Sequence, residues 1–273
     1  MSNTQPLTDR TALDLHRARA LRAPAEFLQE AVAVELEERL NEVNKVFRRP
    51  LLIGHFMAPL RALFPAAPVI ADADRLDVLQ QDHDLAIHAF GLHWADDPVG
   101  QMVQSRLTLK PDGLFLGVMF GGATLQELRT VLAETETRMH GGLSPRVLPM
   151  GDIRDLGGLL QRAGFALPVA DSRKLKVRYP SFTSLVRDLR GMGETNALAQ
   201  RNRKTLTKGF WQTVEAMYQE YFSDGSHLLA TFELVYLTGW APAESQQKPL
   251  RPGSAKTRLS DALNVKETSM KRE

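Results

Sequence analysis

Residues 110–129, KPDGLFLGVMFGGATLQELR, contain the pattern that decides the fold. Leu114–Phe120 is a continuous apolar run, which is typical of a strand buried on both faces of a sheet. The run breaks at Gly121-Gly122, and a helical pattern follows from Thr124 to about Arg138. A buried strand that turns at once into a helix is the repeating unit of a parallel α/β sheet.

The same alternation extends to both sides of this stretch. Further strands are expected at Leu51–Gly54, Val69–Ala71, Leu85–Phe90, Phe165–Ala170, Lys174–Arg178 and Leu228–Thr238. Helices are expected at Met57–Phe64, Pro98–Leu109, Asp152–Ala163, Phe182–Met192 and Asn196–Phe222, with a turn at Lys110–Gly113. Such alternation predicts an α/β fold with a doubly wound, mostly parallel sheet, and the last strands predict an antiparallel edge pair.

The flanking segments give the predicted domain organisation. Residues 1–47 form an N-terminal helical segment, since apolar residues between Phe27 and Val43 recur at helical spacings. We expect this segment to cover a main domain at 48–240 that carries a helical cap at about 181–222. Residues 241–273 are expected to be a basic, flexible tail, because from Lys248 onward seven Lys/Arg face three Asp/Glu.

Composition excludes several classes of protein. The chain has no cysteine, so disulfides, thiolate metal sites and cysteine nucleophiles are ruled out. The 34 Lys+Arg nearly balance the 32 Asp+Glu, which gives no case for a nucleic-acid partner. No apolar run approaches the roughly 20 residues of a membrane span, and the N-terminus MSNTQPLTDR lacks an apolar signal core. We therefore expect a cytoplasmic protein without a membrane span.

One stretch in the middle of the chain, residues 71–94, reads ADADRLDVLQQDHDLAIHAFGLHW. Other distinctive segments are LHWADDPVGQ, LKPDGLFLGVMFGGATLQELR, GGLSPRVLP, DLGGLLQRAGFALPVAD and DLRGMGETNAL. Together they resemble the class I S-adenosylmethionine (SAM) methyltransferases, which have a Rossmann-like fold. The resemblance is to the branch that contains a complex I assembly factor acting as a protein arginine hydroxylase, near the malonyl-carrier-protein methyltransferases of biotin synthesis. It covers about residues 8–263.

This resemblance implies a cofactor, a site and a partner. The cofactor would be SAM, and the matching positions are Gly54 after the first strand, Asp72 and Ala73 in the adenine loop, Ala89, and His93 of the Leu-His-Trp signature. The partner would be a protein, by resemblance a subunit of a respiratory NADH dehydrogenase.

The loop after the first strand departs from the pattern of that family. It reads Gly54-His55-Phe56-Met57-Ala58-Pro59, where several glycines normally let backbone approach the nucleotide. Only 17 residues separate Gly54 from Asp72, so the usual second strand and the acid that binds the ribose are missing. The sequence therefore predicts a sheet one strand short at its N-terminal edge. It also predicts weak or undetectable SAM binding, unless the rebuilt edge lets Asp72 serve the ribose.

Two polar groups have a functional and a structural interpretation. His88 and His93 with Asp84 and Asp96 could form the two-histidine and carboxylate set of a non-haem iron site. Structural or pocket-wall histidines are the favoured interpretation, and we expect no metal. The segment 121–124 either presents backbone N–H groups to a ligand or forms a tight strand-to-helix turn.

The most distinctive polar residues fall late in the chain. Arg146 lies in the loop Gly141–Pro149, and the cap contains Arg187, Arg190, Glu194 and Asn196. We expect these five residues to lie on a partner-binding face, although capping and intrachain pairing would also explain them. No catalytic residue is assigned.

Three functions remain open at this point. The first is an enzyme or helper that modifies or assists a protein partner during complex I assembly. The second is a non-enzymatic binding or assembly factor that kept the fold and lost the cofactor. The third is a SAM-dependent methyltransferase acting on a small carboxylate carrier.

Overall fold

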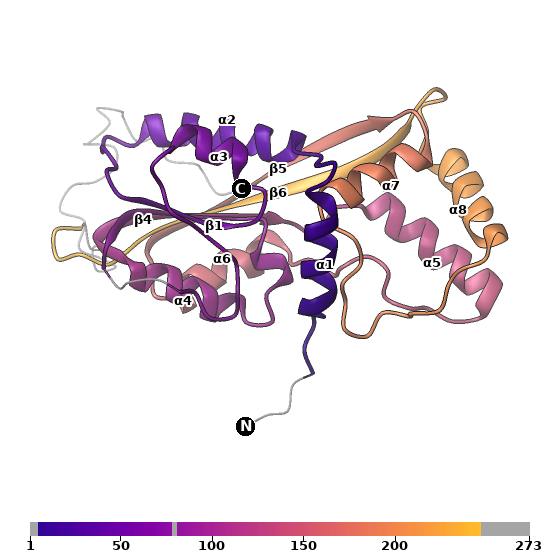
Figure 1. The fold of residues 1–273 in the computed structure, drawn as a ribbon, viewed down its shortest axis with the longest axis horizontal. Helices are drawn as coiled ribbons and strands as arrows, with labels where there is room; N and C mark the ends of the chain where they lie inside the picture. The colour runs from indigo at the N-terminus through magenta and orange to yellow at the C-terminus, as the bar shows by residue number, and fades with distance from the viewer. Residues whose placement is uncertain (1–4, 78–80, 247–273) are drawn as a thin grey trace, which may run out of the picture. The chain divides into compact units, whose positions relative to one another are not determined.

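The computed structural model describes residues 5–77 and 81–246 (Figure 1). The strands are β1 (Pro50–Gly54), β2 (Val69–Ile70), β3 (His83–Ala89), β4 (Leu109–Phe120), β5 (Ala166–Tyr179) and β6 (Leu228–Trp240). The helices are α1 (Arg10–Ala20), α2 (Phe27–Glu42), α3 (Ala58–Leu63), α4 (Pro98–Thr108), α5 (Gln126–His140), α6 (Ile153–Arg162), α7 (Phe182–Gly191) and α8 (Lys208–Tyr221), with a short 3-10 helix η1 (Leu92–Trp94).

In the described residues, the six strands form one sheet in the order β2-β1-β3-β4-β6-β5. β1, β3 and β4 are adjacent and parallel, and β2 pairs in parallel directly with β1. β6 runs antiparallel to both β4 and β5. The order confirms the predicted α/β fold, with its antiparallel edge pair and its shortened N-terminal edge.

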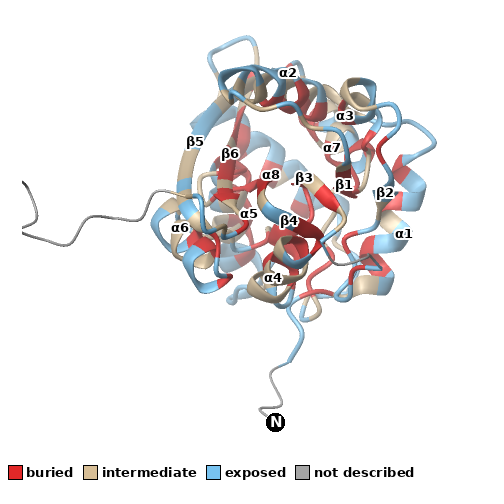
Figure 2. Cartoon of the chain, turned by 90° about the vertical axis from the view of Figure 1, so that its left-hand side faces the viewer, coloured by how far each residue is buried: buried red, intermediate tan, exposed pale blue. Residues whose placement is uncertain are grey.

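Alternating side chains build a core on each face of the sheet. On β3, Leu85 and Ile87 pack in the cluster that contains Leu28 of α2. Ala86, between them, packs in a second cluster with Met102 of α4 and residues of α6. Figure 1 shows α2 and α3 above the sheet and α4 and α6 below it. In Figure 2 the buried residues follow the strands and the inner faces of these helices.

Two predicted breaks turn out to lie within long strands. Lys110–Gly113 was expected to be a turn, but it is part of β4. The β3–β4 register shifts between His83 and Leu85, and Asp112 has φ 62°, so the turn residues form a bulge that keeps the strand going. Phe165–Ala170 and Lys174–Arg178 join into the single strand β5, since β6 pairs along almost its whole length.

The predicted helix Asn196–Phe222 is wrong in its first half. Only Lys208–Tyr221 is helical. Upstream, the Asn196 side chain accepts a hydrogen bond from the Leu198 N–H, and Leu198 forms a bridge with Thr8 near the N-terminus. The side-chain bond and the bridge take the backbone out of the helix, so the cap consists of α7, an extended connection and α8.

The end of the chain lies mostly outside the described residues. Residues 1–242 group as one compact unit and 243–273 as a second, of which only 243–246 are described. The predicted basic tail at 241–273 therefore lies almost entirely outside the described residues. Within the described residues, none of the helices has both the length and the apolar character needed to cross a membrane.

If α2 is an integral layer of the main domain, Leu28→Ala should destabilise the protein by about 2–5 kcal/mol, because it opens a cavity beside the sheet. Leu28 is fully buried, whereas Val34 on the same helix is 58% exposed. Val34→Ala is the matched control and should stay within about 0.5 kcal/mol. Chemical denaturation measures both variants, and equal losses would show that α2 is not a core layer.

Candidate functional site

The centre of the candidate site is the edge where β1, β2 and β3 end. In α/β sheets, ligands bind outside the carboxyl ends of the strands. Asp72, just after β2, lies here and is buried, with 1% of its surface exposed. Arg17, from the buried side of α1, donates to both of its carboxylate oxygens, from Nη1 to Oδ1 at 2.8 Å and from Nη2 to Oδ2 at 3.1 Å. The N-terminal helix therefore reaches into the place where the family would bind its cofactor.

Two further groups complete this ion pair. His55 Nδ1 lies 3.0 Å from Asp72 Oδ1, and Arg17 Nη2 also donates to the Phe90 carbonyl at 3.4 Å. Burial would raise the pKa of Asp72, but the hydrogen bond from His55 and the charge of Arg17 outweigh it and hold that pKa well below its usual range. Asp72 is therefore an anion whose two oxygens both have partners from this chain.

The loop after β1 is closed by its own side chains. Gly54 has φ 138°, and a Cβ added to it would lie 2.3 Å from the Ala89 carbonyl oxygen and 2.3 Å from Met57 Cε. Phe56 lies against Gly193, because a Cβ on that glycine would be 3.2 Å from Phe56 Cε2. Gly54 is thus required by close packing of the chain against itself.

Behind Asp72, a chain of polar groups fixes the adenine-loop region. The Ala73 carbonyl accepts from Gln101 Nε2 at 3.2 Å, and Gln101 Oε1 lies 3.1 Å from His88 Nε2. Burial lowers the pKa of His88 to about 4, so this histidine is neutral at neutral pH. Outside the pair lies an open depression of about 410 Å³, lined by residues 71–74 with Arg10, Asp14, Arg17 and His55.

A second group of polar side chains lies at the end of α7. Glu194 Oε2 accepts from Trp94 Nε1 at 2.7 Å and lies 3.2 Å from His93 Nε2. His93 is buried, and its ring meets Phe120 with centroids 5.0 Å apart. The carboxylate is therefore held in place by two ring nitrogens from η1.

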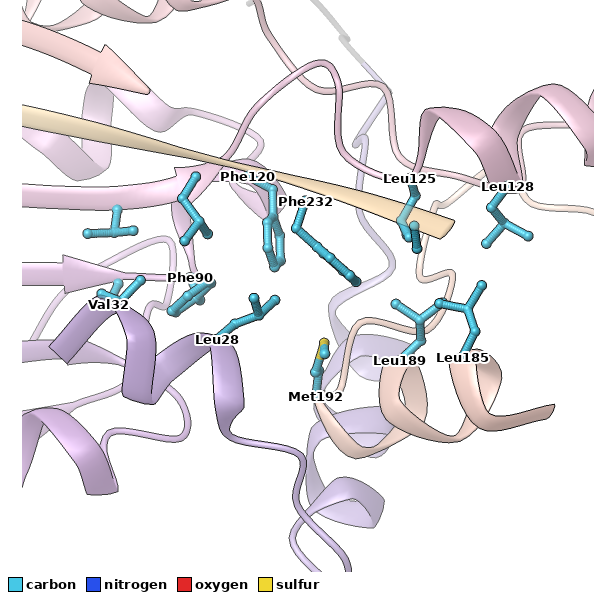
Figure 3. Packing of buried hydrophobic residues seen from close by; sticks show 14 of the residues in the cluster. Leu28, Val32, Phe90, Phe120, Leu125, Leu128, Leu185, Leu189, Met192 and Phe232 are labelled. Atoms are coloured by element: carbon cyan, nitrogen blue, oxygen red, sulfur yellow. The ribbon is translucent and has the colours of Figure 1, made fainter. Parts of the chain in front are cut away.

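Glu194 forms part of the wall of a pocket of about 270 Å³ between the sheet and the cap. Figure 3 shows the apolar side of this region, where Leu125 and Leu128 point toward Leu185 and Leu189 of α7, with Phe120 and Phe232 beside them. The lining also includes Trp94, Met150, Phe182 and Trp211. Two guanidinium groups also line the pocket, Arg146, which is paired with Glu136, and Arg190. The anchored carboxylate in this largely apolar hollow suits a ligand with an apolar body and a cationic end that reaches Glu194.

The predicted partner residues fall into two groups. Arg146, Arg190, Glu194 and Asn196 all line the pocket, whereas Arg187 lines the open groove beside it. Arg146 Nη2 donates to Glu136 Oε1 at 2.6 Å, and Asn196 Nδ2 donates to the Pro145 carbonyl at 2.9 Å. The Asn196 bond thus joins the cap to the loop Gly141–Pro149, and binding of a partner by this face stays a prediction.

The predicted cofactor residues form a separate group. Gly54 and Ala89 are register partners at the ends of β1 and β3, and Asp72 and Ala73 lie in the adjacent loop. His93 is not part of the polar contacts around Asp72 but joins Glu194 at the pocket.

The four candidate iron ligands and the segment 121–124 do not form a ligand site in the described residues. Each of the four candidate iron ligands has its own partner: Asp84 accepts from the N–H groups of Arg48 and Arg49, and Asp96 from those of Leu7 and Thr8. Among the described residues, no three His, Cys, Asp or Glu side chains lie together as a metal site. All four N–H groups of 121–124 donate within the chain, two of them to Glu233, one to the Gly151 carbonyl and one to the Gly121 carbonyl, so this segment is a tight turn.

Several residues of the site were missed by sequence reasoning. Neither Arg17 nor His55 was predicted to belong to the site. Arg17 is buried although its neighbours Ala18 and Arg19 are exposed. A lone cation on the apolar face of α1, next to Leu13 and Ala20, was the signal that could have indicated a buried ion pair.

Known proteins share sequence with this chain. No protein-family model matches the chain. The protein named arginine-hydroxylase NDUFAF5, mitochondrial, from Danio rerio is 39% identical over 203 residues, covering 74% of this chain and 63% of that protein. Its namesake from Rattus norvegicus is 35% identical over 238 residues, covering 85% of this chain and 68% of that protein. Malonyl-acyl-carrier-protein O-methyltransferase from Laribacter hongkongensis is 34% identical over 196 residues, covering 71% and 64%.

A solved structure shows only a general likeness. The cyclase SpnF matches at 15% identity with a TM-score of 0.48, covering 87% of this chain and 97% of that one, a score too low to argue from. This chain spans 63% of the length of the Danio rerio relative.

Removing Arg17 should destabilise the folded protein, because it leaves Asp72 buried and charged with only His55 and the more distant Arg10 beside it. We expect Arg17→Ala to lower the free energy of unfolding by about 3–5 kcal/mol. Arg19→Ala, two residues along the same helix and exposed, should cost less than about 0.5 kcal/mol. Urea denaturation of both variants at neutral pH makes the comparison, and an Arg17→Ala protein as stable as the control would refute the ion pair.

Proposed function

Because the chain belongs to the NDUFAF5 arginine-hydroxylase family, we propose that it binds a protein partner and takes an arginine side chain of that partner into the pocket beside Glu194. The observation that carries this proposal is the carboxylate of Glu194, anchored by Trp94 and His93 in a hollow that is otherwise largely apolar. The activity of the full-length relatives is not transferred whole, since this chain spans 63% of one and 68% of another.

The chemistry of the pocket suits an arginine better than other side chains. A guanidinium is planar, always charged, weakly hydrated and able to stack on aromatic rings. Its aliphatic stem can lie along Leu125, Leu128 and Leu189, while its head pairs with Glu194. Trp94 and Phe120 supply aromatic faces nearby. A partly buried charged pair of this kind is stronger than one at the surface.

We also propose that the cleft at the ends of β1 and β3 does not take SAM. The residues there do not fit the cofactor, because both oxygens of Asp72 are engaged by Arg17 and His55 and the loop from Gly54 is filled by Met57 and Phe56. The depression that remains outside is lined mostly by residues with charged or polar side chains, and Ala71 and Ala73 are the apolar residues on its wall. Binding, and no chemical step, is the activity that this geometry supports.

The biological setting is a further part of the proposal. The resemblance to the complex I assembly branch makes a subunit of a respiratory NADH dehydrogenase the proposed partner, with this chain acting as an assembly factor. Arginine hydroxylation, which the name of the relatives states, would use the same pocket. Those relatives are named as mitochondrial, and the cytoplasm stays a prediction for this chain.

A second candidate function is methyl transfer from SAM to a carboxylate carrier. The similarity to malonyl-acyl-carrier-protein O-methyltransferase favours it. The pocket does not separate it from the first candidate by charge alone, because a malonyl carboxylate would meet both the anion of Glu194 and the guanidinium of Arg190. Production of a methyl ester from SAM and malonyl carrier protein would establish this candidate over the first.

The proposal predicts a charge-specific response of the pocket. N-acetyl-arginine amide should quench or shift the fluorescence of Trp94 and Trp211, and should bind at least about tenfold more tightly than the citrulline analogue, which has the same shape without the charge. Glu194→Gln should remove this preference while keeping the fold, since glutamine can still accept from Trp94. Glu215→Gln, an exposed acid on α8, is the matched control. Equal binding of the two amides, or no effect of Glu194→Gln, would reject the proposal.

A further inference from the structure

A second, larger hollow lies next to the pocket. It is an open groove of about 950 Å³ lined by residues of α1, α7 and α8. Four of its side chains are cations, and one is an acid: Arg19, Arg187, Arg190 and Lys208 against Glu215. Trp211 also lines it and is 41% exposed. The chain as a whole is nearly neutral, so this excess of positive charge is local.

The four cations have no partner within the described part of the chain. None of them forms an ion pair or a side-chain hydrogen bond among residues 5–77 and 81–246, and all are exposed. Elsewhere on the surface, arginines find acids, as Arg178 does with Asp224 and Arg203 with Asp9. Unpaired like charges gathered on one side of a groove repel one another, and a ligand of opposite charge relieves that repulsion.

The groove and the pocket share part of their walls. Phe182, Val186, Arg190, Thr195 and Trp211 line both of them. A chain segment lying in the groove could therefore insert one side chain past Arg190 and Trp211 into the pocket. The carboxylate of Glu194 lies only on the pocket side, whereas Arg190 lines both hollows and the other three unpaired cations line only the groove.

From this we propose that the groove binds an acidic segment of the partner protein, next in sequence to the side chain that enters the pocket. The inference rests on the proposed function for the occupant of the pocket and adds the chemistry of the flanking residues. Aspartate or glutamate on the segment pairs with Arg187, Arg190 and Lys208, and its backbone or an apolar side chain packs on Trp211.

A nucleic acid fits this surface less well than a peptide. A phosphate backbone that followed the groove would meet the carboxylate of Glu194 at its inner end and Glu215 at its side. Only one exposed aromatic side chain, Trp211, is available in the groove as a stacking platform, whereas single-strand binding uses several in succession. The net charge of +2 provides no long-range attraction for a polyanion.

The test uses fluorescein-labelled synthetic peptides and the full chain. One peptide has a central arginine between runs of glutamate, and a second has every glutamate replaced by glutamine. Fluorescence anisotropy should show at least about tenfold tighter binding of the acidic peptide, with a preference that falls as salt is raised. Arg187→Glu combined with Lys208→Glu should abolish that preference.

The matched control places the same two charge reversals elsewhere. Arg154→Glu with Arg162→Glu changes two exposed cations of α6, outside the groove, and should leave the preference intact. Circular dichroism melting of both double variants checks that they fold. An acidic peptide that binds no better than the glutamine peptide, or the same loss in the α6 variant, would overturn the acidic-segment proposal.

Two more ligands separate the remaining outcomes. If single-stranded oligothymidine binds as tightly as the acidic peptide and depends on the same two cations, the groove is a general polyanion surface and the proposal is wrong. If an acidic peptide with central alanine binds as well as the arginine peptide, the groove proposal holds and the arginine pocket of the proposed function fails.

Discussion

The rest of the structure depends on the buried pair of Arg17 and Asp72. It joins α1, near the start of the chain, to the loop after β2 and to the ends of β1 and β3, with His55 and the Phe90 carbonyl as further partners. A buried ion pair contributes little net stability, but it tolerates no partial assembly, because either charge alone would be buried without a partner. The pair therefore fixes where the N-terminal helix sits. That position determines which part of an otherwise ordinary α/β sheet is left open.

Because α1 covers one end of the cleft, the larger open hollow lies at the cap. With α1 against the ends of β1 and β3, the pocket lies near the end of β4 and the start of β6, and the groove lies beside it along α1, α7 and α8. There the carboxylate of Glu194 lines the pocket, and the groove is lined by four cations without partners among the described residues, of which Arg190 also reaches the pocket. One hollow suits a cationic side chain and the other an acidic segment, which is a pattern for recognising a stretch of protein more than a small metabolite. In the proposed function, the α/β sheet provides a rigid platform and the cap provides the recognition.

Local sequence predicted most of the fold but only part of the site. The runs at 51–54, 85–90 and 114–120 are apolar enough to specify central strands, and the short distance from Gly54 to Asp72 specified the missing strand. The region 196–207 was predicted wrongly because its backbone is held by pairing with Leu7 and Asp9, almost two hundred residues away. Arg17 was missed for the same reason. A charged side chain looks exposed in a local pattern, and only its distant partner Asp72 reveals Arg17 as buried.

The most direct test of the central claim is isothermal titration calorimetry of the purified chain with SAM. We expect no measurable heat of binding with SAM at up to about 1 mM, because Arg17 and His55 occupy Asp72 and Met57 fills the space beside Gly54. A melting scan at the same concentration should show no shift, whereas micromolar affinity would stabilise the protein by about 4 kcal/mol at a thousandfold excess over Kd. A micromolar Kd for SAM would contradict the account, since the cofactor would then displace the Arg17 pair or bind beside it.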